Sequence, residues 1–194
     1  MLTGLSGDWR DIWKDAKLPF YVVQLPGYDS WMMQSSLDFP AIRRCQEEVA
    51  DSVEDVYLCS ISDVGEEKDI HPKDKKTVGH RLALLARKYT YGEELLADAP
   101  VLKKAERKGE NRWPAFANAG ERRRMAGDQV AALPITKGKE KIPFTAEAEK
   151  ERLVLTPDTL PEDSVKVDLA QTGWYQINLY NSADIPAIPF SVRC

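Results

Sequence analysis

Two nearly unbroken apolar runs do the most to limit what this chain can fold into. They are residues 20–25 (FYVVQL) and residues 53–61 (VEDVYLCSI), and neither shows a regular alternation of apolar and polar side chains. A strand without alternation is typical of a parallel sheet that is covered on both faces. The sequence therefore predicts two adjacent or nearly adjacent parallel strands in an α/β fold.

Helical patterns flank both runs. Residues 2–13 place five apolar side chains on one face of a first helix: Leu2, Leu5, Trp9, Ile12 and Trp13. A second helix is predicted over residues 41–51, where the spacing turns three side chains inward: Ile42, Cys45 and Val49. Helices alternating with buried strands are characteristic of half of a doubly wound, flavodoxin-like sheet.

A third helix is predicted over residues 74–91, preceded by a short polar loop (DIHP, residues 69–72). Its inward face carries Val78, Leu82, Leu85 and Tyr89, and Gly92 is suited to a left-handed cap at its end. Pro72 fits at or just before the first turn, where the helix makes no hydrogen bond with the backbone N–H that proline lacks. Ligands of doubly wound sheets bind beyond the carboxyl ends of the strands, which is where this arrangement places His71.

After Gly92 the pattern changes. Alternation and turn residues replace helical spacing from residue 113 onward, with candidate strands at residues 144–148, 152–156, 164–170 and 174–180. In one of them Val165, Val167 and Leu169 share a face. The predicted organisation is a parallel-sheet part (residues 1–92), a connecting segment (93–112) and an antiparallel β module (113–194).

Composition narrows the possible partners. The formal net charge is −4, which argues against a nucleic-acid partner. No apolar run approaches membrane-spanning length, and residues 1–4 do not begin a secretion signal. Cys45 and Cys59 are predicted as small core residues, and with two histidines in the chain neither a metal nor another cofactor is expected.

Several segments resemble one known family, in the same order along the chain. They are DWRDIWKDAKLPFYVVQLPGY (residues 8–28), DIHP with KKTVGHRLA (within 69–83) and LYNSADIPAIPF (179–190). These stretches are similar to the carboxyl-terminal half of the sialate O-acetylesterases, a carbohydrate-esterase branch of the SGNH hydrolases. The resemblance is dense in residues 8–92 and 174–190 and thin in 110–145.

The resemblance implies roles for four residues. His71 would be the general base, and Asp69 is the nearest candidate to orient its imidazole. The family usually has its aspartate three residues before the histidine, whereas position 68 here is lysine, so a backbone carbonyl is the alternative. Gln24 and Tyr28 would border the substrate cleft. The substrate would be an O-acetylated sugar, with sialic acid first and acetylated plant polysaccharide second, in a secreted or periplasmic setting.

The nucleophile is the missing part. The chain contains no Gly-Asp-Ser, Gly-Gln-Ser or Gly-x-Ser-x-Gly segment, which such an esterase needs for its serine and oxyanion donors. Two interpretations follow. The chain is an esterase fragment or subunit completed by an amino-terminal half, or it is a non-catalytic carbohydrate-binding or structural protein derived from that fold. Uncovered sheet edges and apolar surface predict association with the missing half or with a second copy.

Overall fold

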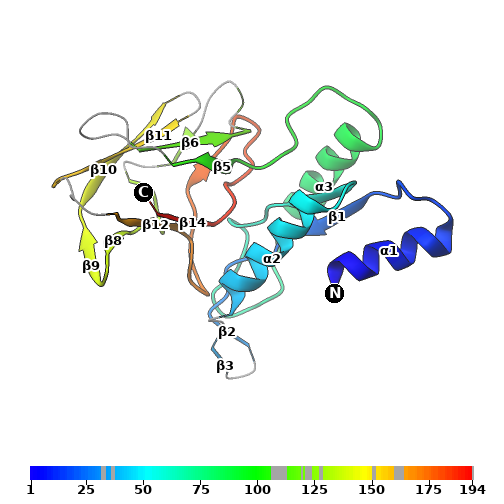
Figure 1. The fold of residues 1–194 in the computed structure, drawn as a ribbon, viewed down its shortest axis with the longest axis horizontal. Helices are drawn as coiled ribbons and strands as arrows, with labels where there is room; N and C mark the ends of the chain where they lie inside the picture. Colours follow the sequence, from blue (N-terminus) through cyan, green and yellow to red (C-terminus); the bar gives the residue numbers. More distant parts are fainter. Residues whose placement is uncertain are drawn as a thin grey trace.

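A computed structural model of the chain describes residues 1–31, 34–35, 38–105, 113–118, 120, 124–126, 129–149, 152–159 and 164–193. Figure 1 shows two parts: an α/β part that contains the three helices, and a β-rich part built from the second half of the chain. The predicted fold class, a parallel α/β sheet followed by an antiparallel β region, is confirmed.

The two apolar runs form the two parallel strands. β1 (Phe20–Val23) pairs in parallel with β4 (Val56–Cys59), with Phe20 opposite Val56 and Val23 opposite Cys59. Among the described residues this sheet has two strands, so the second edge of β1 has no partner strand there. All four β1 side chains are only half-buried, which fits a sheet that is incompletely covered.

Three helices surround this sheet: α1 (Leu2–Trp13), α2 (Phe39–Ser52) and α3 (Lys75–Tyr89). α2 packs on β4, and α3 packs on both strands, as the sequence predicts. The α3 face of the sheet carries Tyr21, Val23, Tyr57 and Cys59, in one cluster with Val78, Leu82 and Leu85 of the helix. Gly92 adopts the expected positive φ of 71° just beyond α3. A two-stranded hairpin, β2 (Ser30–Trp31) and β3 (Gln34–Ser35), precedes α2.

The predicted inward face of α2 is wrong at two of its three residues, and the third, Val49, is half-buried. Ile42 and Cys45 are exposed, whereas Arg43 is only 1% exposed. The covered stripe runs instead through Arg43, Gln46, Glu47 and Ala50, at the helical spacing i, i+3, i+4 and i+7. Polar side chains occupy this stripe because they bond to the ends of β1 and to the β region. Cys59, by contrast, is buried as predicted.

α1 turns its apolar face to solvent. Figure 1 places α1 at the far end of the molecule from the β-rich part. Of its residues only Ser6 is buried, and the predicted apolar stripe is open, with exposures of 49% for Leu5, 47% for Trp9, 73% for Ile12 and 64% for Trp13. Arg10 anchors the helix by donating to Leu18 O (3.1 Å) and Glu54 O (2.7 Å). Exposed apolar patches of this kind mark contact surfaces.

The second half of the chain forms antiparallel sheets. One has the order β10-β11-β6-β5 and another the order β14-β12-β8-β9, and β7 pairs with β13. The strands are β5 (Val101–Lys104), β6 (Trp113–Ala117), β7 (Arg124–Met125), β8 (Ile135–Lys137), β9 (Glu140–Ile142), β10 (Phe144–Glu149), β11 (Arg152–Pro157), β12 (Lys166–Leu169), β13 (Leu179–Tyr180) and β14 (Phe190–Arg193).

Most strand predictions for this region hold. β10, β11 and β12 lie within a residue or two of their predicted ranges, and Val165, Val167 and Leu169 are at most 1% exposed in the largest apolar core. Of the predicted strand 174–180, only Leu179–Tyr180 is a strand. Residues 93–112 were expected to connect the two parts, and Val101–Lys104 within them forms β5. None of the helices in the described part of the chain is long and apolar enough to cross a bilayer.

The open face of α1 predicts self-association or association with another polypeptide. At tens of micromolar the chain should exceed monomer mass by light scattering and bind a hydrophobic dye. Replacing Trp9 and Trp13 with serine should reduce both signals, because it removes apolar area from this face. Tyr91→Ser is the matched control, since Tyr91 is 76% exposed but lies beyond α3. A dye-negative monomer would contradict the prediction.

Candidate active site

Three segments meet at the carboxyl end of the parallel sheet: the loop after β1, the loop after β4, and residues 170–178 of the β region. A side-chain Cβ added at Gly65 would collide with the backbone oxygen of Gly27. One added at Gly27 would lie 3.0 Å from the backbone oxygen of Tyr175. Tyr28 N–H donates to Gly173 O at 3.0 Å. The backbones therefore touch, and glycine at positions 27 and 65 makes this approach possible.

Arg43 joins the β1 loop to the β region. Its guanidinium donates to Pro26 O (3.4 Å), Ala170 O (3.1 Å) and Thr172 O (2.5 Å), and it lies 4.9 Å from the centre of the Tyr175 ring. Burial lowers the pKa of Arg43 because the charged form loses its hydration. Its contacts are carbonyl oxygens and an aromatic face, which stabilise a cation without forming an ion pair.

Gln46 and Gln24 complete the link between α2 and β1. Gln46 accepts from Leu25 N–H (2.9 Å) and donates to Val23 O (3.2 Å), so it continues the hydrogen bonding of β1 beyond its last residue. Gln24 is 1% exposed and donates to Arg43 O at 3.4 Å. Its Oε1 has no hydrogen-bond partner among the described residues.

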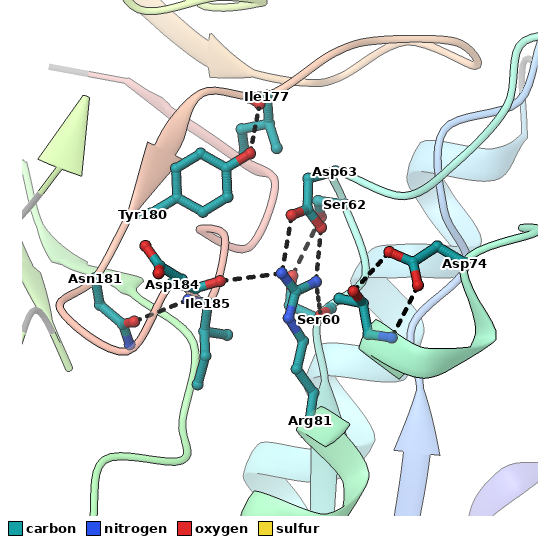
Figure 2. A network of polar contacts seen from close by, with 11 residues as sticks. Ser60, Ser62, Asp63, Asp74, Arg81, Ile177, Tyr180, Asn181, Asp184 and Ile185 are labelled. Carbon is teal, nitrogen blue, oxygen red and sulfur yellow. Dashed lines mark hydrogen bonds and ion pairs between the residues drawn. The ribbon is translucent and has the colours of Figure 1, made fainter. Parts of the chain in front are cut away.

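Arg81 of α3 fixes the loop after β4. It forms a two-pronged ion pair with Asp63, at 2.6 Å and 2.8 Å, and both side chains are largely buried. The same guanidinium donates to Ser60 O (3.3 Å) and to Asp184 O (3.0 Å). Figure 2 shows Arg81 between the strand-end loop and the loop that carries Asp184. One side chain thus connects the parallel sheet, α3 and the β region.

The histidine loop follows on the same side of the sheet. Asp69 Oδ1 accepts the backbone N–H of His71 at 2.9 Å and lies 3.3 Å from His71 Nδ1. The pKa of Asp69 is lowered, first by that backbone hydrogen bond and then by the imidazole. The His71 side chain is 78% exposed. Lys73 bonds to Glu66 (2.8 Å), and Asp74 caps α3 by accepting from Thr77 N–H (3.0 Å), so both ends of the loop are tied.

The structure therefore brings Asp69 and His71 together, in an arrangement in which the carboxylate can orient the imidazole. Gln24 and Tyr28 lie on the β1 loop as expected, but both are buried, and Tyr28 stacks on Phe39 at 5.9 Å. The sequence patterns do not identify Arg43, Arg81 and Asp63 as the residues that hold these loops together. A signal for Arg81 was present, because it falls between Val78, Leu82 and Leu85 on the inward stripe of α3.

Two cavities adjoin the sheet. One of about 500 Å³ lies along β4 and the end of α2, with acidic side chains that include Glu47 and Asp98, and Tyr57 and Tyr89 in its wall. Another, of about 280 Å³, is lined by Ser62, Asp63 and Gly65 of the β4 loop and by residues 174–178. The smaller cavity lies at the strand ends, where ligands of such sheets bind. The described residues contain no cluster of His, Cys, Asp and Glu suited to a metal ion.

The fold defined by these elements is esterase-like. No protein-family model matches the sequence, and neither does any curated protein. Among solved structures the chain is similar to XAC1771, described as a novel carbohydrate acetylesterase from Xanthomonas citri. The two share 28% sequence identity with a TM-score of 0.78 over 95% of this chain. This chain spans 43% of the length of that protein. The likeness supports a carbohydrate-esterase type of protein.

The Arg81–Asp63 pair gives a stability prediction. Arg81→Met should lower the free energy of unfolding by about 3–5 kcal/mol, because it leaves the Asp63 carboxylate buried without its partner. Arg87→Met breaks the exposed pair with Glu93 and should cost less than about 1 kcal/mol. Urea denaturation of both variants measures the difference. Equal losses would show that Arg81 does not hold this loop.

Glu47 gives a pH prediction. Burial, with Asp51 and Glu48 nearby, raises its pKa from 4.5 to about 7. Below 4.5 the side chain is neutral in both folded and unfolded chains. As the pH rises from 4.5 to 7 the unfolded chain ionises first, so stability falls. Glu47→Gln should therefore unfold at higher urea than wild type at pH 8, and show a smaller gain at pH 5.

The matched control for this pH experiment is Glu140→Gln, on the exposed strand β9, which should leave the pH dependence of stability as in wild type. If Glu47→Gln gains as much at pH 5 as at pH 8, the carboxylate of Glu47 is not the source of the loss.

Proposed function

We propose that this chain supplies the general base and part of the sugar-binding surface of a carbohydrate O-acetylesterase of the SGNH type, within the sialate O-acetylesterase family. The observation that carries the proposal is the pair Asp69–His71, exposed on the loop after a parallel strand in a fold similar to a carbohydrate acetylesterase. The family assignment itself rests on the resemblance of residues 8–28, 69–83 and 179–190.

The proposed reaction is an acyl transfer through serine. Asp69 holds Nδ1 of His71, which leaves Nε2 to take the proton of a serine hydroxyl as that oxygen attacks the acetyl carbonyl. The imidazolium then gives the proton to the departing sugar oxygen, and an acetyl-serine remains. Water, deprotonated by the same imidazole, releases acetate and restores the serine. Because the pKa of Asp69 is lowered, its carboxylate is ionised at neutral pH and stabilises the imidazolium.

The serine is proposed to come from another polypeptide segment. Ser60 and Ser62 of this chain are at most 3% exposed, and their hydroxyls lie 3.3 Å apart, which suits structural side chains better than an exposed nucleophile. The open edge of β1 and the exposed apolar face of α1 are two surfaces that a segment with a further parallel strand could cover. That segment would carry the oxyanion donors as well.

A non-catalytic carbohydrate-binding protein is the second candidate. The cavity beside Trp174 and Tyr175 favours it, because aromatic and polar groups converge there without a nucleophile. The two candidates differ in one outcome: acetyl release that depends on His71 supports the esterase, whereas sugar binding without any such release supports the binding protein.

His71→Ala tests the esterase. The assay uses this chain together with the proposed serine-bearing segment, and acetate release from an O-acetylated sugar is measured. The substitution should lower kcat by a factor of about 10³ or more, because base and serine act as one unit. Asp69→Asn should cost less, since a backbone carbonyl can also orient the imidazole.

His80→Ala is the matched control, because His80 is the other histidine of the chain and is exposed on α3. It should leave kcat unchanged. Robust acetate release by residues 1–194 alone, surviving His71→Ala, would contradict both the role of His71 and the external serine.

A further inference from the structure

The cavity at the carboxyl end of β4 has walls that are held firmly. Asp63 on one side is bonded through both carboxylate oxygens to Arg81. On the other side, Asn178 donates to Ala126 O (2.8 Å) and Gln129 O (2.7 Å) and accepts from Ala131 N–H (2.8 Å). Thr172 donates to Trp174 O at 2.6 Å, and Arg43 lies over the Tyr175 ring. The cavity is therefore preformed, which limits the entropy lost on binding.

Within the described part of the chain, the Tyr175 hydroxyl is a weakly bonded polar group in its wall. Tyr175 is 5% exposed, and its hydroxyl makes no hydrogen bond of ordinary geometry among the described residues, although the Ser62 side chain is near. A buried hydroxyl without a partner costs free energy that a ligand can recover. Ser62, which also lines the cavity, offers a second hydroxyl.

The size and chemistry of the lining fit a sugar ring. At about 30 Å³ for each water, a cavity of about 280 Å³ holds roughly nine waters. Trp174 contributes an aromatic surface for the apolar C–H groups of a pyranose, and hydroxyl and amide side chains surround it. Sugar hydroxyls both donate and accept, so they can bond to the Tyr175 hydroxyl and also to Ser62, whose hydroxyl already contacts Ser60.

Charge selects which sugars fit. Asp63 is the one charged residue that lines the cavity within the described part of the chain, and no Lys, Arg or His joins it there. Arg81 lies behind Asp63 with its donors already bonded to Asp63, Ser60 and Asp184, so it is not free for a ligand. Because Arg81 already neutralises Asp63, the described lining of the cavity offers no free cation. The carboxylate of a sialic acid would therefore lose its hydration there without a partner of opposite charge, which costs free energy.

We infer that the cavity between Ser62, Asp63, Trp174 and Tyr175 is a subsite for one uncharged sugar ring of the acetylated carbohydrate, and that it disfavours sialic acid. This inference rests on the proposed function and names its substrate class: a neutral acetylated saccharide. It places the sugar at the same end of the sheet as His71, on loops that Arg43 and Arg81 hold together.

Ligand-observed NMR and titration calorimetry with the wild-type chain test it without any catalysis. The probes are the methyl glycosides of glucose, galactose, mannose and xylose, compared with N-acetylneuraminic acid at equal concentration. At least one neutral glycoside should bind more tightly than the sialic acid. Trp174→Ala should weaken that binding at least about tenfold, and Tyr175→Phe about threefold to tenfold, because it deletes one hydrogen-bonding hydroxyl.

Trp9→Ala is the matched control, since it removes an exposed tryptophan from α1 and should leave sugar binding unchanged. Gln176→Arg, at the exposed rim of the cavity, should improve binding of N-acetylneuraminic acid by supplying a cation. Tyr175→Phe is nearly isosteric and keeps the test decisive if Trp174→Ala fails to fold. No binding of any neutral glycoside, equal or tighter binding of N-acetylneuraminic acid, or affinities unaffected by both aromatic substitutions would overturn the inference.

His71→Ala separates this inference from the proposed function. The subsite predicts that His71→Ala binds the neutral glycoside like wild type. If the neutral glycoside binds but the completed protein releases no acetate, the esterase proposal is contradicted and the subsite is still supported. Acetate release that depends on His71, together with sugar binding that is unaffected by substitution of Trp174 and Tyr175, would support the esterase and contradict the subsite.

Discussion

The site depends on two buried arginines that connect parts of the chain lying far apart in sequence. Arg81 bonds to Asp63 and Asp184, and Arg43 bonds to Pro26, Ala170 and Thr172. Breaking such a contact leaves a buried charge or carbonyl without a partner, which costs more than the intact contact contributes. The loops at the carboxyl end of the sheet are therefore held in one arrangement by contacts that are expensive to break. The β region supplies carbonyl groups that these arginines bond to, and the histidine loop extends from the loop that follows β4.

This arrangement separates rigid and accessible parts. The strand ends, Gly27, Gly65 and Tyr175 are packed backbone against backbone, whereas His71 is mostly exposed on a loop tied at both ends by Glu66 and Asp74. An exposed imidazole suits the proposed reaction, in which a serine approaches from a separate segment. The apolar face of α1 and the open edge of β1 also belong to the α/β part. The surfaces proposed to receive the partner segment are therefore on the same half of the chain as His71.

The sequence predicts the scaffold better than the site. Unalternated apolar runs identified β1 and β4, because burial on a parallel sheet leaves that signature. The apolar spacing predicts Ile42, Cys45 and Val49 on the inward face of α2, whereas polar Arg43 and Gln46 occupy it because they bond to backbone groups elsewhere in the fold. The alternation predicts a strand over residues 174–180, but only Leu179–Tyr180 is one, and side-chain bonds from Thr172 and Asn178 accompany the irregular backbone before it. Such long-range polar contacts leave no periodic signal, so the cavity at Trp174 emerged only from the three-dimensional structure.

We propose that His71 activates a serine that lies outside residues 1–194. The most direct measurement is labelling of the completed protein with a fluorophosphonate, which reacts with an activated serine, followed by peptide mass spectrometry to locate the adduct. We expect one dominant adduct, on a serine of the other segment, and a labelling rate that falls sharply when His71 is replaced by alanine. A dominant adduct on Ser62 or any other serine of residues 1–194, or labelling that ignores His71, would contradict it.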